Sequence, residues 1–314
     1  MLLVRPAPAQ IEALIDYAGR LADANGVASS WAIYAMLRTG SHADPLGGVS
    51  RADLEAMDFR LAGGYVIWRN TRFAAGDLSR RSAAVCPHCL DAHPVRPALW
   101  RFYWAVGCPQ HHCLLVDRCP RCNAALMSGI GTAQRCGCGY DLRRARTSDL
   151  PDDVRDFQLL LEDAFLKRAG LPRCTGPSTH PAAPLILDLE GLALLRRAIV
   201  LTPEPTLRPR GVSPAALDHR FARVRALANV FRRGRASVVE KWQETWARCR
   251  ADHGSRAAKS GRGQCLVDLR HWCLAAPKDS LLRGLGECLN YDGAQMPRGR
   301  AAARRKSVAE CATS

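Results

Sequence analysis

Apolar side chains near the start of the chain recur at the spacing of an amphipathic helix. Within the stretch PAPAQIEALIDYAGRLADANG they fall at three- and four-residue steps, which is the repeat of one helix face. Asn25 and Gly26 follow the last apolar position, and both residue types commonly end helices. The pattern therefore predicts a helix that ends at Asn25-Gly26, with one face formed by Ile11, Leu14, Ile15, Ala18, Leu21 and Ala22.

Two more short helices are predicted before residue 60. The segment SSWAIYAMLRTG, residues 29–40, indicates the first of them, and Ser50 followed three residues later by Asp53 is typical of a capped start for the second. Three short helices joined by small turns are compatible with a helix-turn-helix, and also with other small helical bundles. We expect residues 1–80 to form an N-terminal, helix-turn-helix-like part.

Helical spacing returns in the second half of the chain. Residues 150–170 predict one helix, and Ser213 with Pro214 provides a cap and a first-turn proline for the next. Beyond that helix, Ser237 with Glu240 predicts the cap of a further one. The residues that this last helix is expected to bury are Trp242, Trp246 and Cys249.

Arginines occupy the other faces of the two predicted C-terminal helices. With the segment RRGRAS between the helices, they could present guanidinium groups to the phosphates of DNA. A solvated helical hairpin explains the same pattern equally well. The residues that we predict to contact DNA are Arg220, Arg223, Arg232, Arg233 and Arg235.

Charge strengthens the case for a polyanionic partner. The formal net charge is +16, and residues 201–314 hold 22 basic and 10 acidic side chains, whereas residues 1–80 hold 8 of each. Nucleic acid is favoured over a membrane surface because no aromatic-rich amphipathic anchor accompanies the basic segment. The alternative is that the arginines serve only solubility.

The apolar runs are too short to span a bilayer. GLALLRRAIV, for example, is interrupted by two arginines well short of the ~20 residues that a spanning helix needs. The opening residues MLLVRPAPAQ lack the apolar core of a secretory signal. We therefore expect a cytoplasmic protein with no membrane partner, in which closely spaced cysteines are more often metal ligands than disulfides.

Eight side chains that can bind a metal lie in four close pairs within 53 residues. Two thiolates on one tight turn can face the same ion, and a second turn completes a tetrahedron. Four pairs therefore predict two structural zinc ions. The candidate ligands are Cys86, Cys89, Cys108 and His111 for one ion, and Cys119, Cys122, Cys136 and Cys138 for the other.

Spacing alone leaves the pairing of the turns open. Pairing in chain order gives the two sets above, whereas a cross-braced arrangement joins the first pair with the third and the second with the fourth. Four protein ligands per ion leave no position for a reactive water, which disfavours a zinc-dependent hydrolase. Cys113 stands beside the first set without a partner of its own. A buried strand residue is the favoured interpretation, and a substitute ligand is the alternative.

These patterns predict a mainly α protein with small zinc-ribbon or zinc-finger β elements. Two adjacent zinc modules are expected between a helical N-terminal part and a helical C-terminal region. The predicted segments are an N-terminal helical part (1–80), a paired zinc-finger module (81–145), a helical connector (146–200), a basic helical region (201–291) and a disordered basic tail (292–314).

The order of the motifs resembles the TniQ family, whose members are target-selection proteins in transposition and include the TnsD-type proteins. RLADANG, CPHC, a Trp-Arg stretch, GCPQHHCLLVDRCPRC and CGCGYDL follow one another as in that family, over about residues 5–145. The positions that carry the likeness are Leu21 to Gly26, Cys86 with Cys89, Trp100 with Arg101, Cys108 to His111, Cys119 to Cys122, and Cys136 to Leu142.

The resemblance implies a protein without catalytic activity that links target recognition to an AAA+ ATPase regulator of transposition. We expect DNA as a further partner, with a CRISPR effector complex and a second copy of the chain as alternatives. The runner-up hypothesis is a zinc-finger DNA-binding transcriptional regulator unrelated to transposition. The predicted surface for the ATPase includes Trp31, Tyr34, Tyr65 and Trp68.

Overall fold

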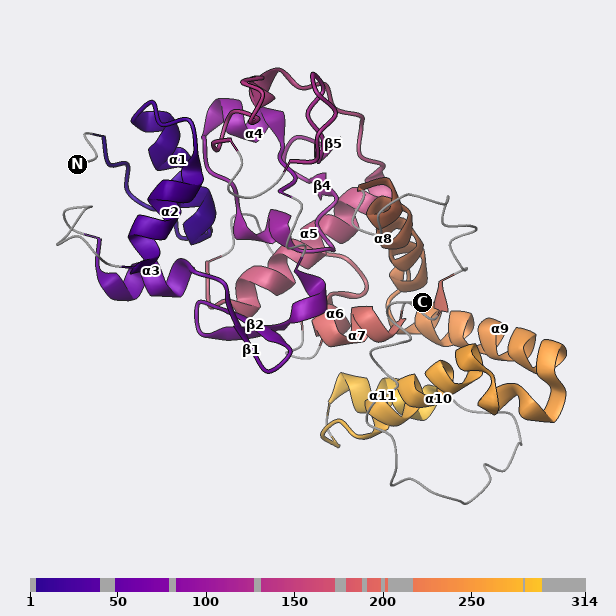
Figure 1. Cartoon of the computed structure of the whole chain (residues 1–314). Coiled ribbons are helices and arrows are strands. Elements are labelled where there is room, and N and C mark those ends of the chain that lie inside the picture. The colour runs from indigo at the N-terminus through magenta and orange to yellow at the C-terminus, as the bar shows by residue number, and fades with distance from the viewer. Residues whose placement is uncertain are drawn as a thin grey trace. The chain divides into compact units, whose positions relative to one another are not determined.

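The structure is a computed structural model. It describes residues 4–39, 49–78, 83–126, 131–172, 179–187, 191–198, 201–202, 217–278 and 280–289. The chain divides into two compact units, one made of Met1–Pro177 with Arg210–Phe221 and the other of Ser178–Pro209 with Ala222–Ser314. The described elements are mainly helices with two small antiparallel sheets, which confirms the predicted mainly α class (Figure 1).

The first unit contains five helices, two sheets and the beginning of a sixth helix among its described residues. Its helices and strands are α1 (Leu14–Ala24), α2 (Ser30–Thr39), α3 (Arg51–Met57), β1 (Arg60–Ala62), β2 (Tyr65–Trp68), β3 (Thr71–Ala74), α4 (Pro87–Ala92), β4 (Gly107–Cys108), β5 (Cys113–Leu114), α5 (Asp152–Arg168) and the first residues of α8 (Leu217–Phe231).

Helices α1, α2 and α3 surround one apolar core, and their ends follow the predicted signals. The side-chain amide of Asn25 donates to the carbonyl of Leu21 at 2.8 Å, and Gly26 adopts a φ of 67° that favours glycine. The hydroxyl of Ser50 accepts a hydrogen bond from the backbone N–H of Asp53 at 3.1 Å, capping α3. These three helices are confirmed, and a helix-turn-helix geometry stays a prediction.

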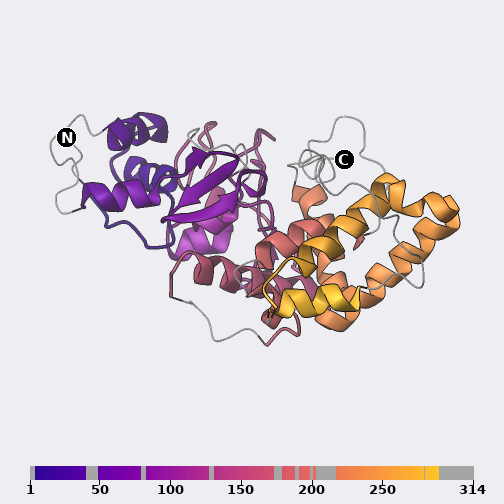
Figure 2. The same cartoon turned by 90° about the horizontal axis from the view of Figure 1, so that it is seen from below.

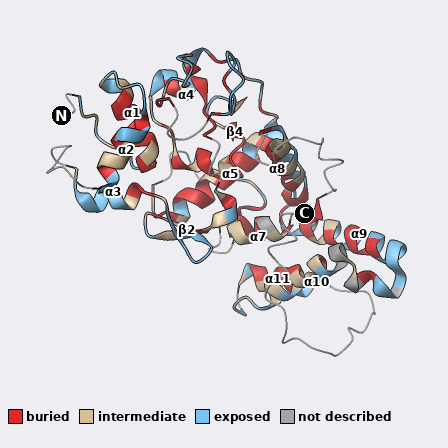
Figure 3. Cartoon of the chain, in the orientation of Figure 1, coloured by how far each residue is buried: buried red, intermediate tan, exposed pale blue. Residues whose placement is uncertain are grey.

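A three-stranded antiparallel sheet of β1, β2 and β3 follows α3 and was not predicted (Figure 2). Gly63-Gly64 and Arg69-Asn70 form its two-residue loops, and all four residues have positive φ, as type I′ turns require. One face of the sheet is buried through Val66 and Phe73, whereas the β1–β2 hairpin tip is exposed (Figure 3).

Aromatic rings join this sheet to α5. Phe165 of α5 stacks on Trp68 and on Phe73, with 5.2 Å between ring centroids in each pair, and meets Phe102 edge-on at 4.9 Å. Trp68 is therefore fully buried, so the prediction that it belongs to an exposed binding surface is wrong. Phe102 begins the segment that leads into β4, the strand that carries Cys108. This aromatic core therefore fixes the position of the chain just before the first predicted zinc ligand set.

The described part of the second unit is helical. In α9 the indoles of Trp242 and Trp246 stack at 5.8 Å, and both residues are buried as predicted. The predicted cap at Ser237 is wrong, because α9 begins two residues earlier and Ser237 instead donates to the carbonyl of Gly234 at 3.1 Å. The described helices of the second unit are α6 (Ala183–Ile186), α7 (Gly191–Ala198), the remainder of α8, α9 (Arg235–His253), α10 (Gly261–Leu274) and α11 (Leu281–Cys288).

Some predictions fall outside the described residues, namely the helix start at Ser213 and Pro214 and the basic tail 292–314. Among the helices that the structure describes, none combines the length and the apolar character needed to cross a bilayer.

Candidate metal centres

The first cluster, here called site 1, is built by α4 and the β4–β5 hairpin. Cys86 is the N-cap of α4, Pro87 holds the first helical position, and Cys89 lies in the first turn, so the two thiols face the same point. Cys108 ends β4, and His111 lies in the loop before β5. The four donor atoms, one from each of Cys86, Cys89, Cys108 and His111, lie within 4.8 Å of one another.

The separations within site 1 are those of ligands around one ion. His111 Nδ1 is 3.6 Å from Cys86 Sγ and 3.5 Å from Cys108 Sγ. The same nitrogen is 3.1 Å from Cys89 Sγ, which in turn is 3.6 Å from Cys108 Sγ. Ligands about 2.3 Å (sulfur) and about 2.1 Å (nitrogen) from a tetrahedral zinc would be separated by about 3.8 Å for two sulfurs and about 3.6 Å for sulfur and nitrogen.

The second cluster, site 2, is built by two tight turns. Cys119 and Cys122 lie on one turn, and Cys136 and Cys138 lie on the other. The Sγ atoms of Cys119 and Cys138 are 3.6 Å apart, and those of Cys122 and Cys136 are 3.8 Å apart. Asn123, with a φ of 55°, follows the first turn. These sulfur separations also match a tetrahedral zinc.

The structure groups the eight donors in chain order and not in the cross-braced arrangement. Each group is a closed set of four side chains, Cys₃His in site 1 and Cys₄ in site 2. Such closed sets are typical of structural zinc, since a catalytic zinc keeps one position for water or substrate. The chemistry of the donors fits zinc because thiolate sulfur and imidazole nitrogen are its usual protein ligands.

Each cluster contains one cysteine that ionises more readily than a free thiol. Hydrogen bonds from the thiols of Cys108 and then Cys113 lower the pKa of Cys86. Burial tends to raise the pKa of Cys119, but the backbone N–H groups of Cys122 and Arg121 lower it to about 7. A thiolate is the form that binds a metal.

Comparison with known families identifies the first part of the chain. Residues 3–115 match the family model described as TniQ. We call these residues the TniQ region. The resemblance seen in the sequence is thereby confirmed over this TniQ region, which implies a transposition-associated role. The region ends just after β5, so it contains all of site 1, whereas site 2 and the second unit lie outside it. No curated protein matches the chain.

Helix α1 of the TniQ region holds the segment that leads to site 1. Its Asp16 accepts two hydrogen bonds from Arg101, at 2.5 Å from Nε and 2.6 Å from Nη2, and both side chains are buried. This is a bidentate ion pair across 85 positions of sequence. Since Arg101 precedes β4, the pair fixes the strand that carries Cys108 relative to α1.

The same helix also holds the segment that leads to site 2. Asp23 accepts hydrogen bonds from the hydroxyl of Thr132 and, at 2.9 Å, from the backbone N–H of Gln134, two residues before Cys136. The buried guanidinium of Arg96 donates to the carbonyl of Thr132 at 3.1 Å, and burial lowers the pKa of Arg96 to about 10.

Arg220 is not on a DNA-binding surface, so that prediction is wrong. It is 0% exposed in α8, within the first unit. Its Nε donates to the carbonyl of Tyr103 and its Nη2 to that of Phe102, both at 2.9 Å, and Nη2 also donates to Ala105. Burial lowers the pKa of Arg220 to about 10, so it remains charged at neutral pH.

The other four predicted DNA-contact arginines lie in the second unit. Arg232, Arg233 and Arg235 are exposed around the turn between α8 and α9, whereas Arg223 is half-buried. Arg233 forms an ion pair with Glu240, and Arg235 donates to the sulfur of Cys288. Their contact with DNA stays a prediction.

Proposed function

We propose that sites 1 and 2 each bind a structural zinc ion. The proposal is supported by two closed sets of four soft or borderline ligands at the separations of a zinc tetrahedron. Structural zinc binding contributes roughly 10–16 kcal/mol in small peptides, which is comparable with the whole stability of a domain, about 5–15 kcal/mol. Residues 83–143 are therefore expected to lose their fold when zinc is removed.

Metal analysis of the purified full chain tests this proposal. We expect close to two zinc ions per chain, and close to one after either Cys122→Ser or the double change Cys86→Ser with Cys113→Ser, which also removes the neighbouring thiol. Cys273→Ala is the control, because Cys273 is a buried cysteine outside both clusters and its loss should leave the ratio at two. A folded chain with almost no metal, or an iron–sulfur absorption spectrum, contradicts the proposal.

We further propose that the protein is a non-catalytic adaptor of DNA transposition that links target recognition to an AAA+ ATPase regulator. The observation that supports this most directly is the TniQ match over residues 3–115. The closed donor sets agree with a structural use of metal. In this proposal the zinc sites keep the surface of the TniQ region in one shape, which reduces the entropy lost on docking.

The binding surface that we propose for the ATPase consists of exposed apolar side chains in the TniQ region. Trp31 is 58% exposed, and its ring lies 5.4 Å from that of Tyr34, whose hydroxyl donates to Asp58. Tyr65 and Leu61, 49% and 56% exposed, lie beside the β1–β2 turn. Aromatic residues are enriched in protein interfaces, and the balanced charge of residues 1–80 is poorly suited to holding phosphates alone.

Capture of an AAA+ ATPase encoded beside this protein, with ATP and DNA present, tests the adaptor proposal. We expect the full chain to capture it and Trp31→Ser or Tyr65→Ser to weaken the capture. Leu281→Ser is the matched control, since Leu281 is a large apolar residue 47% exposed in the second unit. If Leu281→Ser weakened the capture and the other two variants did not, the ATPase-binding surface would lie in the second unit and the proposed surface would be wrong. Sequence-specific DNA binding without ATPase capture would favour the zinc-finger regulator.

DNA is the second partner that we propose, with the exposed arginines around the α8–α9 turn as its contacts. The excess of basic residues after residue 200 supports this. Each phosphate contact on duplex DNA adds about −0.9 to the slope of log affinity against log salt concentration. Replacing Arg232 with Gln is therefore expected to flatten the slope, and an unchanged slope contradicts a contact at this residue.

A further inference from the structure

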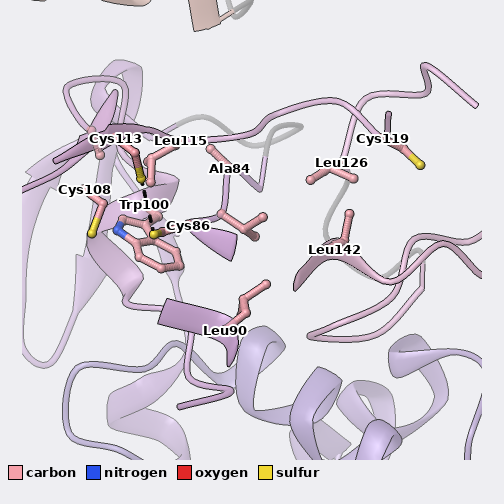
Figure 4. Packing of buried hydrophobic residues seen from close by; sticks show 12 residues of the cluster. Ala84, Cys86, Leu90, Trp100, Cys108, Cys113, Leu115, Cys119, Leu126 and Leu142 are labelled. Carbon is pink, nitrogen blue, oxygen red and sulfur yellow. Dashed lines mark hydrogen bonds between the residues drawn. The ribbon is translucent and has the colours of Figure 1, made fainter. Parts of the chain in front are cut away.

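A fifth cysteine thiol lies beside site 1. Cys113, 3% exposed, stands on β5 directly across the hairpin from Cys108 of β4. Its Sγ is 3.7 Å from that of Cys86, and Figure 4 shows the two sulfurs facing each other beside Trp100. This separation is close to the distance of about 3.8 Å between two thiolates on one tetrahedral zinc. Cys113 is therefore at the separation of a fellow ligand from Cys86, although it lies outside the set of four donors that are all within 4.8 Å of one another.

The β4–β5 hairpin carries both Cys113 and the donor that it could replace. His111 lies in the connecting loop and is exposed, whereas Cys113 is held in a strand whose next residue, Leu114, donates to the carbonyl of Ser148 at 2.8 Å. His111 is also the only nitrogen donor of the set. Exposure lets water compete for its position on an ion, and a buried thiol lies two residues away along the chain.

We propose that site 1 has five donors and that Cys113 is a replacement ligand, which takes the fourth position on zinc whenever His111 leaves it. This rests on the proposed zinc function of site 1. Zinc has no geometric preference from its d electrons and accepts Cys₄ as readily as Cys₃His, so the exchange keeps a closed tetrahedron. The incoming thiol gives up its proton to solvent as its sulfur binds the metal.

The full chain with His111→Ala tests the exchange. We expect it to keep close to two zinc ions, and its cobalt-substituted form to show absorption bands shifted to longer wavelength, as four thiolates replace three. The double variant His111→Ala with Cys113→Ser is expected to keep only one zinc ion. The matched control is His111→Ala with Cys273→Ala, which removes a cysteine equally buried but outside the site and should keep two.

Loss of one zinc ion from His111→Ala, in a chain whose unaltered form holds two, overturns the proposal. An unaltered chain whose cobalt spectrum already equals that of His111→Ala also overturns it, because Cys113 would then be a resident ligand. An unaltered chain that holds no zinc instead refutes the proposed zinc function itself.

A second measurement applies if the His111 variant does not fold. Cys113→Ser alone keeps all four resident donors, and we expect it to hold two zinc ions but to release one of them to a chelator roughly 10-fold faster than the unaltered chain, the scale typical of losing a residue just outside a metal's ligand set. Equal release rates for the two proteins overturn the replacement role.

Discussion

Replacing Arg220 with Met is expected to destabilise the first unit without a direct effect on DNA affinity. The variant keeps an unbranched apolar stem in place of the methylene part of arginine and removes the guanidinium. The backbone carbonyls of Tyr103 and Ala105 then lose this donor, and that of Phe102 keeps only the backbone N–H of Ala105. These carbonyls belong to the segment that enters β4, so the loss also affects the support of site 1.

The size of the effect follows from these contacts. A hydrogen bond to a charged group contributes about 1.5–3 kcal/mol, and Arg220 makes three within a fully buried setting. The three do not add fully, because removing the charge also removes its desolvation penalty. We therefore expect Arg220→Met to lower the free energy of unfolding by about 3 kcal/mol, a large fraction of the stability of a typical domain.

Urea unfolding of the zinc-loaded full chain measures this change in unfolding free energy. Titration with duplex DNA at several salt concentrations tests whether the DNA affinity stays unchanged. Arg232→Met is the matched control, because Arg232 lies exposed just beyond the end of the same helix. Its replacement should change the unfolding free energy by less than about 0.5 kcal/mol. The two variants should therefore differ in what they change: Arg220→Met should lower stability, and Arg232→Met should reduce the salt dependence of DNA binding.

The opposite result would refute the reasoning. If Arg220→Met unfolds like the unaltered protein and its DNA titration loses about 0.9 from the salt slope, the guanidinium contacts phosphate and the buried arrangement is wrong.

Three further changes probe the supports of the metal clusters and the ionisation of α5. Asp16→Asn leaves Arg101 buried without its charge partner, so urea unfolding should show a loss of about 3–5 kcal/mol, and adding Arg101→Met should recover part of it. Gly131→Ala should speed zinc release from site 2 to a chelator, because a Cβ there would lie 2.3 Å from the carbonyl of Arg135 at a φ of 81°. Burial raises the pKa of Glu162 to about 7, so the folded chain binds this proton more tightly than the unfolded chain. The contribution of Glu162 to stability should therefore fall by about 2.5 kcal/mol as pH rises from about 4.5 to 7, and Glu162→Gln should remove that pH dependence of the unfolding free energy.

Local signals in the sequence were sufficient for the helix ends and the ligand sets. Asn25 and Ser50 act through neighbours one turn away, and two cysteines on a tight turn need no distant residue to face one point. Such features depend on spacing alone, which a sequence displays. The choice between chain-order and cross-braced pairing needed the structure, because it depends on where the second turn of each site is held.

The sheet of β1, β2 and β3 was missed although its signals are present. Gly63-Gly64 and Arg69-Asn70 each separate short runs of β-forming residues by two positions, as in hairpins. The strands have three or four residues, too few for alternation to stand out beside three helices. Trp68 was misplaced for the same reason, since only the pairing of the strands puts it on the buried face.

The error at Arg220 has a different origin, because the helical repeat itself contains the correct answer. Arg220 lies three residues after Leu217 and four before Val224, two buried positions of α8, so it belongs to the buried face and not to the opposite one. A charged residue inside an apolar repeat thus indicates a buried side chain with a buried partner. A count of net charge includes that residue without distinguishing it from an exposed one.

That distinction narrows the predicted DNA contact. Among the described residues, four arginines are buried and bound to carboxylates or carbonyls, so they add to the net charge of +16 without adding a surface for phosphate. They are Arg20, Arg96, Arg101 and Arg220. At the α8–α9 turn, Arg233 is already paired with Glu240. DNA must displace that carboxylate to reach Arg233, and losing the ion pair offsets part of the free energy gained from a phosphate contact. Arg232, by contrast, is exposed. Arg232→Gln should therefore flatten the salt slope more than Arg233→Gln, and equal slopes for the two variants would show that the ion pair does not restrain Arg233.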